Sequence, residues 1–244
     1  MIRVLLVGGS DSSGGAGIAR DVATVSGMGA HGCIAVTAVT AQDDAGLLAV
    51  HPVPPDMVAR QIRAAGDVGA VKLGMLRGAD TIRAVAAALP SAPLVIDPVL
   101  RTSSGGALLD GAGLNALLTD LLPRAAVLMP NLPELDAIGA CLGTACLGTR
   151  GRDATIAALL GRGCGALLVK GGHADDPGTC TDRLFLPGAA EQRFSGPRLP
   201  GTLRGTGCQL ASAVAAGLAA GEALPAAIRR ARALVADRFA ARQP

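Results

Sequence analysis

The chain has 244 residues, of which 50% are apolar, and its formal net charge is +3. This length and apolar content fit a single α/β domain over residues 1–244. The charges are scattered and the chain has 3 phenylalanines but no tryptophan or tyrosine, so nothing supports nucleic-acid binding. No apolar stretch is long enough to cross a bilayer, and the N-terminus does not resemble a signal peptide. We therefore expect no membrane contact and a cytoplasmic protein.

Short apolar runs alternate along the chain with helical patterns. The predicted buried strands are residues 3–7, 33–39, 70–73, 94–96, 126–129 and 166–169. The predicted helices between them are residues 18–28, 56–65, 81–88, 114–122, 133–141 and 154–160. An antiparallel pair at 184–186 and 192–194 precedes two final helices near 206–219 and 224–240. The alternation predicts an α/β fold with a mostly parallel central sheet.

Polar and glycine-rich segments follow most of the predicted strands. Ligands of such sheets bind outside the carboxyl ends of the strands, so these segments are where chemistry is expected. They are residues 8–11, 40–42, 74–75, 97–98, 131–134 and 170–173. The first of them continues to Gly17 but lacks the GxGxxG spacing of a dinucleotide site, and neither lysine follows a phosphate loop of the Walker A kind.

The strongest chemical signal is the sequence Gly205-Thr206-Gly207-Cys208 directly before an alanine-rich helix. Glycines let the backbone amides turn outward, and together with the helix dipole these amides form a site for an anion such as a phosphoryl group. A thiol at a helix start has a lowered pKa, so Cys208 is a candidate base for a substrate hydroxyl. An ordinary capped helix with a buried cysteine explains the spacing equally well.

Two lysines stand among twenty arginines, and both lie near the end of an apolar strand with a glycine within two residues. An ammonium group at a strand end can bind phosphate as a point charge, which favours Lys170 as a nucleotide contact. The alternative is a solvent-exposed strand end, and this explanation fits Lys72 better than Lys170.

The segment Asn131-Leu132-Pro133-Glu134 follows a predicted strand and begins a helix. Asn131 can cap that helix and Glu134 can interact with its positive end, which is a purely structural explanation. Alternatively, Glu134 and Asp97 on the neighbouring strand end hold Mg²⁺ through water, as phosphoryl transfer requires.

Taken together, these motifs resemble those of the hydroxymethylpyrimidine/phosphomethylpyrimidine kinases. The matching blocks are residues 9–18, 37–42, 72–76, 97–99, 130–134, 170–173 and 205–208. Sugar kinases of the same superfamily usually end the last block with Asp, whereas this chain has Cys208. The resemblance implies a ribokinase-like three-layer α/β/α sandwich and phosphorylation of 4-amino-5-hydroxymethyl-2-methylpyrimidine, then of its monophosphate, with ATP and Mg²⁺. It also implies a homodimer.

The resemblance further implies a role for individual residues. Cys208 would be the base, Gly205 and Gly207 would line the anion hole, and Gln42 would hydrogen-bond the aminopyrimidine. The substrate pocket would be formed by Gly9, Asp21, Met75 and Val99, and the ATP phosphates and Mg²⁺ would be served by Asp97, Asn131, Glu134, Lys170 and Thr206.

The chain departs from the family pattern at Leu203-Arg204, where Thr-His is common. Arg204 either adds a phosphate contact to the nucleotide site or impairs one of the two phosphorylations, with the second as the more exposed step. Two other functions remain open. One is a pyridoxal or pyridoxine kinase, and the other is a non-catalytic protein of the same fold that binds a pyrimidine.

Overall fold

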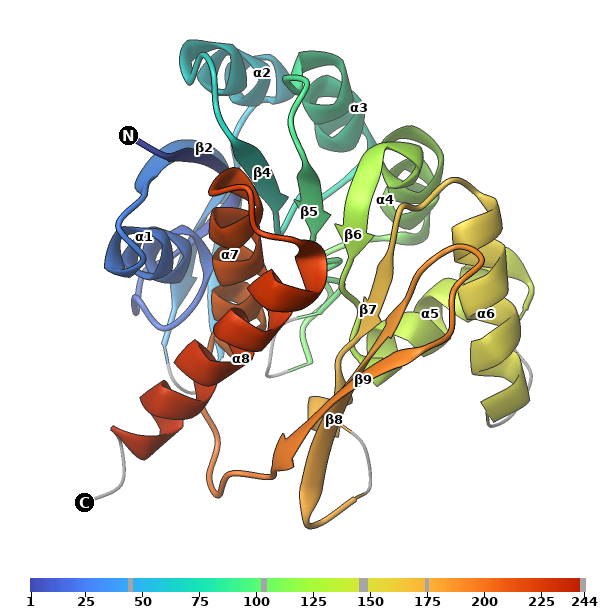
Figure 1. Cartoon of the computed structure of the whole chain (residues 1–244). Coiled ribbons are helices and arrows are strands. Elements are labelled where there is room, and N and C mark those ends of the chain that lie inside the picture. The colour runs from blue at the N-terminus through green and yellow to red at the C-terminus, as the bar shows by residue number, and fades with distance from the viewer. Residues whose placement is uncertain (44–45, 102–104, 145–148, 174–175, 242–244) are drawn as a thin grey trace.

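The computed structural model describes residues 1–43, 46–101, 105–144, 149–173 and 176–241. A nine-stranded sheet runs through the molecule in the order β3-β2-β1-β4-β5-β6-β7-β8-β9 (Figure 1). Its parallel strands are β1 (Arg3–Asp11), β2 (His31–Gln42), β4 (Ala70–Leu73), β5 (Leu94–Ile96), β6 (Ala125–Leu128) and β7 (Leu167–Val169). The antiparallel strands are β3 (Leu47–Pro52) at one edge, and β8 (Thr179–Phe185) and β9 (Gln192–Pro197) at the other.

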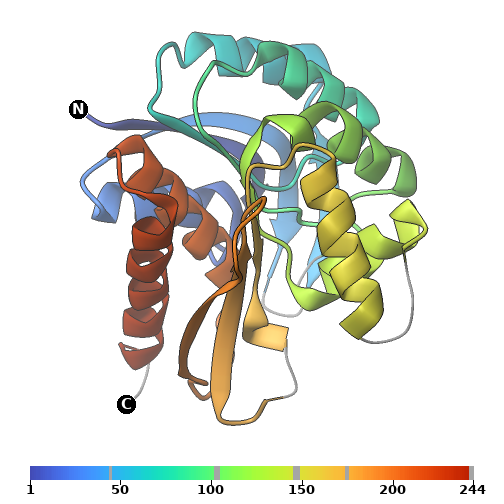
Figure 2. The ribbon, with the colours of Figure 1, turned by 45° about the vertical axis from the view of Figure 1, so that its right-hand side comes forward.

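Helices cover both faces of the sheet, as the implied three-layer sandwich requires (Figure 2). One face carries α1 (Gly17–Gly27), α7 (Thr206–Ala219) and α8 (Leu224–Ala240). The other face carries α2 (Pro55–Ala64), α3 (Ala79–Ala88), α4 (Gly111–Ala116), α5 (Leu132–Leu142) and α6 (Thr149–Gly161). Alternate residues of each strand feed these two cores, with Val4 and Leu6 on the α7 side and Leu5 and Val7 on the α2 side.

The predicted α/β fold with a mostly parallel sheet is confirmed, and several predicted boundaries needed correction. β1 and β2 run beyond their apolar cores into polar residues, because both strands continue pairing to Asp11 and Gln42. The strand Leu47–Pro52 was not predicted, although residues 47–50 form an apolar run; it is an antiparallel edge strand whose residues are exposed or half-buried. The predicted helix 114–122 is α4 followed by one π-helical turn at Leu117–Leu121 and a 3₁₀ turn at Leu122–Arg124.

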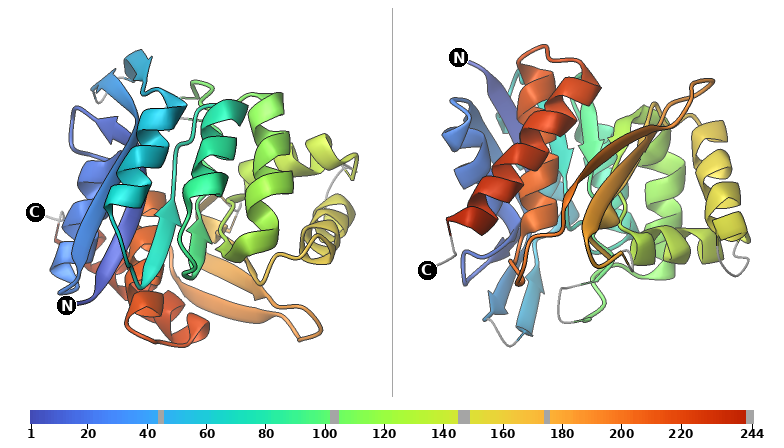
Figure 3. Two further views of the ribbon diagram at one scale, coloured as in Figure 1. Left: turned by 90° about the horizontal axis from the view of Figure 1, so that it is seen from above. Right: turned by 60° about the horizontal axis from the view of Figure 1, so that its bottom comes forward.

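The parallel strands all run in the same direction, so their carboxyl ends lie together at one end of the sheet. The arrows of β4, β5 and β6 point downward toward this end in Figure 1, and the right-hand view of Figure 3 brings it forward. The N-terminus of α7 meets the sheet here, so segments from both halves of the chain converge at one place. Within the described ranges, none of the helices has both the length and the apolar character needed to cross a membrane.

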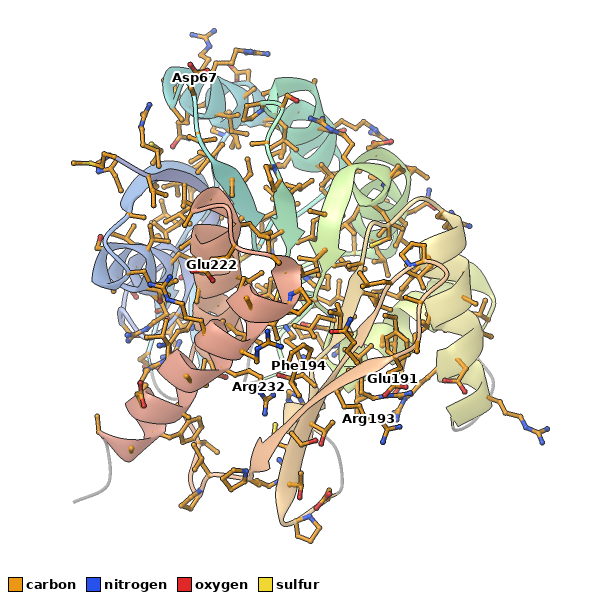
Figure 4. The ribbon with its side chains drawn as sticks, viewed as in Figure 1. Asp67, Glu191, Arg193, Phe194, Glu222 and Arg232 are labelled. Atoms are coloured by element: carbon orange, nitrogen blue, oxygen red, sulfur yellow. The ribbon has the colours of Figure 1, made fainter. Side chains whose placement is uncertain are left out.

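The last helix and the β8–β9 hairpin are joined by buried charges. Arg232 of α8 forms an ion pair with Asp182 of β8 and donates to the Cys180 carbonyl at 3.0 Å. Figure 4 shows Arg232 beside the hairpin, and also the adjacent Glu191 and Arg193, whose ion pair is 2.7 Å long. The second Asp182 oxygen accepts the Gly171 amide at 2.7 Å. Asp182 therefore connects α8 to the turn that follows β7.

We expect Gly171→Ala to lower the free energy of unfolding by about 1–3 kcal/mol, as overpacking in a tightly packed interior does. A Cβ at Gly171 would collide with the Thr181 carbonyl of β8. Gly172→Ala is the matched control, because a Cβ at Gly172 meets nothing within 4 Å. Urea unfolding of both variants measures the difference, and equal stabilities would contradict the proposed close approach.

Candidate functional site

The N-terminus of α7 is formed by a glycine in the left-handed region. Gly205 is the N-cap residue with φ of 73°, and the first helical hydrogen bond runs from the Gln209 amide to the Gly205 carbonyl at 2.9 Å. The amides of residues 206–208 precede that bond and point out of the helix end. A Cβ at Gly205 would collide with the Gly15 carbonyl, so the loop after β1 packs directly against this helix start.

Lys170 stands at the centre of the polar groups beside this helix end. Its Nζ lies 2.5 Å from Asp97 Oδ1 and 3.7 Å from Glu134 Oε2. A Cβ built on Gly207 would lie 3.5 Å from both Asp97 Oδ2 and Lys170 Nζ, so the helix start faces these two side chains. Burial lowers the pKa of Lys170, but Asp97 and Glu134 outweigh burial, and the pKa is raised so that the amine stays charged.

Asn131 and Glu134 form a complete capping box at the start of α5. The Asn131 side chain accepts the Glu134 amide at 2.8 Å, and the Glu134 carboxylate accepts the Asn131 amide at 2.7 Å. The structural explanation of this motif is therefore confirmed. The same Glu134 oxygen also faces Lys170, so the cap holds an acid at the site. Burial raises the pKa of Glu134, and the Lys170 charge opposes the rise.

Cys208 is the third residue of α7, and its thiol is surrounded by charge. Burial raises the pKa of the thiol to about 11, while the Lys72 ammonium and a hydrogen bond from the Gly17 amide oppose the rise. Asp21 and Asp97 add to it, because negative charge disfavours a thiolate. The prediction that the helix start lowers this pKa is therefore wrong, since desolvation outweighs the Lys72 charge and the Gly17 amide.

Lys72 is enclosed between the sheet and the helices α1 and α7. Its side chain is only 1% exposed, which makes the prediction of a solvent-exposed strand end wrong. The Asp21 carboxylate accepts hydrogen bonds from Lys72 Nζ and Ser212 Oγ, each 2.7 Å long. Burial lowers the pKa of Lys72, but Asp21 outweighs burial and the pKa is raised. Burial also raises the pKa of the Asp21 carboxyl, and its two partners oppose that rise.

The residues implied for the substrate pocket lie around the end of β1. A Cβ at Gly9 would lie 3.0 Å from Met75 Sδ, so the glycine makes room for that side chain. Gln42 ends β2, and its backbone exchanges hydrogen bonds of 2.8 Å with the Ser12 hydroxyl. The Val99 amide donates a hydrogen bond of 2.8 Å to the Asp97 carbonyl. Asp21 is fully buried and its two oxygens bind Lys72 and Ser212, so it is not exposed to a substrate as the implied role requires.

Arg204 ties the segment before α7 to the loop after β1. Its guanidinium lies 3.0 Å from Asp11 Oδ2 and donates to the Ser13 hydroxyl and the Asp43 carbonyl, both at 2.9 Å. Asp11 also accepts the amides of Ser13 and Ala16. Burial raises the pKa of Asp11, but the hydrogen bonds from Ser13 and the Arg204 charge outweigh it, and the pKa is lowered.

Several residues that shape the site were not predicted from the sequence. Asp11 holds the loop after β1 by accepting hydrogen bonds from the Ser13 and Ala16 amides. It lies within the motif of residues 9–18, but no role was predicted for it. Asp182 and Arg232 hold the Gly171 turn from elements distant in the sequence, and no local pattern marks them. Arg238 of α8 donates to the Arg204 carbonyl at 2.8 Å and so supports the segment that enters α7.

Asp97 and Glu134 are the two acids that converge at Lys170. Across the described part of the chain, no group of three or more His, Cys, Asp or Glu side chains is placed to hold a metal ion. Mg²⁺ in phosphoryl-transfer sites is usually held by one or two carboxylates, with water and substrate phosphates as the other ligands. This pair of acids fits such a partial ligand set.

Sequence comparisons connect this site to known enzymes. The family model described as phosphomethylpyrimidine kinase matches residues 11–243. The hydroxymethylpyrimidine/phosphomethylpyrimidine kinase of Streptomyces coelicolor is 41% identical, over 99% of this chain and 90% of the relative. The enzyme of the same name from Escherichia coli is 40% identical, over 88% and 82%. The thiamine biosynthesis bifunctional protein of Geobacter sulfurreducens is 39% identical over 99% of this chain and 50% of its own length.

Solved structures of related kinases share the fold. A phosphomethylpyrimidine kinase from Clostridium difficile has a TM-score of 0.82 at 30% identity, over 98% of this chain and 100% of the other. A pyridoxal kinase from Staphylococcus aureus, in complex with pyridoxal, has a TM-score of 0.85 at 28% identity, over 97% and 87%. The implied ribokinase-like architecture is thus confirmed. From the sequence match over nearly its whole length, this chain belongs to the phosphomethylpyrimidine kinase family.

Proposed function

We propose that this protein uses ATP to phosphorylate 4-amino-5-hydroxymethyl-2-methylpyrimidine, and then its monophosphate, as a kinase of thiamine biosynthesis. The observation that carries the proposal is the meeting of the α7 N-terminus with Lys170 and Asp97 across Gly207. Backbone amides, an ammonium group and an acid at one point are the groups that orient and stabilise a phosphoryl group in transfer. The names of the relatives support the pyrimidine substrate and the pathway.

The transferred phosphoryl group would lie at the start of α7. The amides of Gly205, Thr206 and Gly207 form the anion hole, because a helix N-terminus combines free amides with positive potential. Lys170 adds a full positive charge that faces Gly207. Asn131 lies beside Lys170 through a backbone bridge and belongs to the same phosphate-binding edge. Complexes of a related pyridoxal kinase with an ATP analogue and with ADP support the use of ATP.

Asp97 and Glu134 would hold Mg²⁺, with water between the ion and at least one of them. When bound, the ion would neutralise charge on the phosphates. Without it, both acids share the Lys170 ammonium, at 2.5 and 3.7 Å. Lys170 therefore keeps two like charges together at the place where a cation would bind.

The pyrimidine would lie against Gly9, Met75 and Val99, with the Gln42 side chain recognising its amino group. Gly9 is suited to this wall because a side chain at that position would displace Met75. Asp21 contributes from below by its contacts with Lys72 and Ser212. In this proposal, the hydroxymethyl group of the substrate would lie between the pocket and the start of α7.

Cys208 would accept the hydroxymethyl proton as the substrate oxygen attacks the γ-phosphorus of ATP. The bond from that phosphorus to the bridging oxygen of the leaving group breaks, and ADP carries the released electron pair. Burial keeps the Cys208 thiol protonated near neutral pH, so the thiolate depends on the surrounding positive groups. The Lys72 ammonium and the Gly17 amide both favour the thiolate, and the Lys170 ammonium adds to them.

We also propose that the protein works as a homodimer in the cytoplasm, where ATP is available. Large apolar side chains from β2, β3 and α2 remain exposed, as expected of a surface that another copy covers. They are Ile34 at 44%, Val39 at 53%, Leu48 at 71% and Met57 at 47% exposure.

Pyridoxal is the second candidate substrate. A pyridoxal kinase from Staphylococcus aureus matches the fold with a TM-score of 0.85. Pyridoxal also carries a hydroxymethyl group on a nitrogen heterocycle, so the same phosphoryl chemistry would serve. A non-catalytic binding protein is a weaker candidate, because the Lys170, Asp97 and Glu134 cluster has no use in pyrimidine binding alone.

We expect the purified protein to convert hydroxymethylpyrimidine to its monophosphate and the monophosphate to the diphosphate, with one ATP consumed per step. Each pyrimidine and pyridoxal are offered separately, and the products are identified by mass. Turnover of pyridoxal alone would overturn the pyrimidine assignment. Binding of a pyrimidine without ATP consumption would show a non-catalytic protein.

Cys208→Ala should lower kcat by about 10²–10⁴-fold, the usual contribution of a positioned proton acceptor. The Kd for hydroxymethylpyrimidine, measured by calorimetry, should stay close to that of the unmodified protein, because the pocket residues are unchanged. Cys180→Ala is the control, since Cys180 lies on β8 and is also partly exposed. Near-normal turnover by the Cys208 variant would remove the thiol from this role.

Arg204→Met should raise the KM for ATP by about tenfold or more, because one charge-assisted hydrogen bond to a phosphate contributes about 1.5–3 kcal/mol. The KM for the unphosphorylated pyrimidine should rise less, through loss of the Asp11 and Ser13 contacts alone. Steady-state kinetics with both substrates measures the ratio. An equal rise for both would show that Arg204 only braces the loops.

A further inference from the structure

Helices α1 and α7 pack side by side, and a residue of one contacts a residue of the other at each of two successive turns. Cys208 and Ser212 lie one turn apart on α7, and Gly17 and Asp21 lie one turn apart on α1. Ser212 donates to Asp21 at 2.7 Å at the lower level, and the Gly17 amide hydrogen-bonds the Cys208 sulfur at the upper level. The lower contact therefore fixes the face of α7 on which the thiol lies.

Lys72 of β4 enters the space beneath these two levels. Its Nζ is directed toward the carboxyl end of the strand, because a Cβ on Gly74, two residues further along, would lie 2.8 Å from it. The ammonium is 1% exposed and is held by Asp21 at 2.7 Å. It is also near enough to the Cys208 thiol for each group to change the charge state of the other.

Charged groups face the thiol from four elements of the described structure. Lys72 comes from β4, Asp21 from α1, Asp97 from the end of β5, and Lys170 from the end of β7. After burial, Lys72 has the largest influence on the thiol. Lys170 is already paired with Asp97 at 2.5 Å. The net charge beneath Cys208 therefore depends chiefly on the Lys72 ammonium and on the Asp21 carboxylate that holds it.

We propose that Lys72, anchored by Asp21 and Ser212, is a positioning residue for Cys208 that holds a fixed positive charge beneath the thiol and favours its thiolate. This inference rests on the proposed function of Cys208 as proton acceptor. Lys72 itself touches neither the reacting atoms nor the nucleotide. Its buried charge lets a thiol in a desolvated site take the hydroxymethyl proton without a histidine beside it.

The test measures alkylation of Cys208 by iodoacetamide across a pH series, in buffer with a chelator and without substrates. Only the thiolate reacts, so the rate follows the thiolate fraction. Peptide mass spectrometry separates Cys208 from the other cysteines, which are Cys33, Cys141, Cys146, Cys164 and Cys180. Lys72→Met removes the positive charge, whereas Asp21→Asn removes the negative one and leaves the ammonium. Both variants break the same ion pair.

The proposal predicts opposite shifts. Below the midpoint, Asp21→Asn should speed alkylation by about tenfold and Lys72→Met should slow it by about tenfold, each equal to one pKa unit. A purely structural ion pair would instead loosen the site in both variants and speed alkylation in both. That common direction, or no shift in Asp21→Asn, would overturn the proposal. If Lys72→Met does not fold, Lys72→Gln takes its place, because it also removes the positive charge and keeps a hydrogen-bond donor for Asp21.

Asp136→Asn is the matched control. It removes a carboxylate from the Asp136–Arg152 ion pair, 2.7 Å long, between α5 and α6, and it should leave the alkylation midpoint unchanged. The alkylation measurement needs neither ATP nor pyrimidine. A protein without kinase activity can therefore still show the opposite shifts, and an active kinase can fail to show them, so the two failures are distinguishable.

Discussion

A lysine ammonium buried beneath a β-sheet requires a carboxylate beside it, and this requirement organises the centre of the molecule. Removing one member of such a buried pair costs about 3–5 kcal/mol, because it leaves an uncompensated charge. Lys72 comes from the middle of the sheet, Asp21 from α1, and Ser212 from α7. Their contacts set the depth and rotation of both helices, and with them the positions of Gly17 and Cys208 one turn above.

A second charge balance lies on the other side of the α7 start. Lys170 holds Asp97 and Glu134 together, and the helix start faces this group at Gly207. The start of α7 lies between these two clusters of opposite charges. In the proposed function, one would control the proton acceptor and the other would bind phosphate and metal, which are the two requirements of phosphoryl transfer to a hydroxyl group.

The fold was predictable wherever a local pattern carried it. Buried strands such as β4 and β5 are continuous apolar runs, and the α7 start is marked by its glycines. The edge strand β3 begins with an apolar run at residues 47–50, so its position was predictable, whereas its antiparallel pairing with β2 comes from tertiary structure. Lys72 illustrates the limit at the site. Its rarity among arginines was visible, but its burial depends on Asp21, 51 positions earlier in the chain.

The dependence of the site on α8 has a consequence for the order of events during synthesis. Arg232 holds the Asp182 carboxylate that fixes the Gly171 turn, and Arg238 holds the carbonyl of Arg204. A nascent chain folds from its N-terminus as it leaves the ribosome, so most of the sheet can pair before residues 224–240 emerge. Such a chain has its strands in place but its candidate site is not assembled. Under the proposed function, nucleotide binding would therefore arise late, and an unfinished chain would not sequester nucleotide.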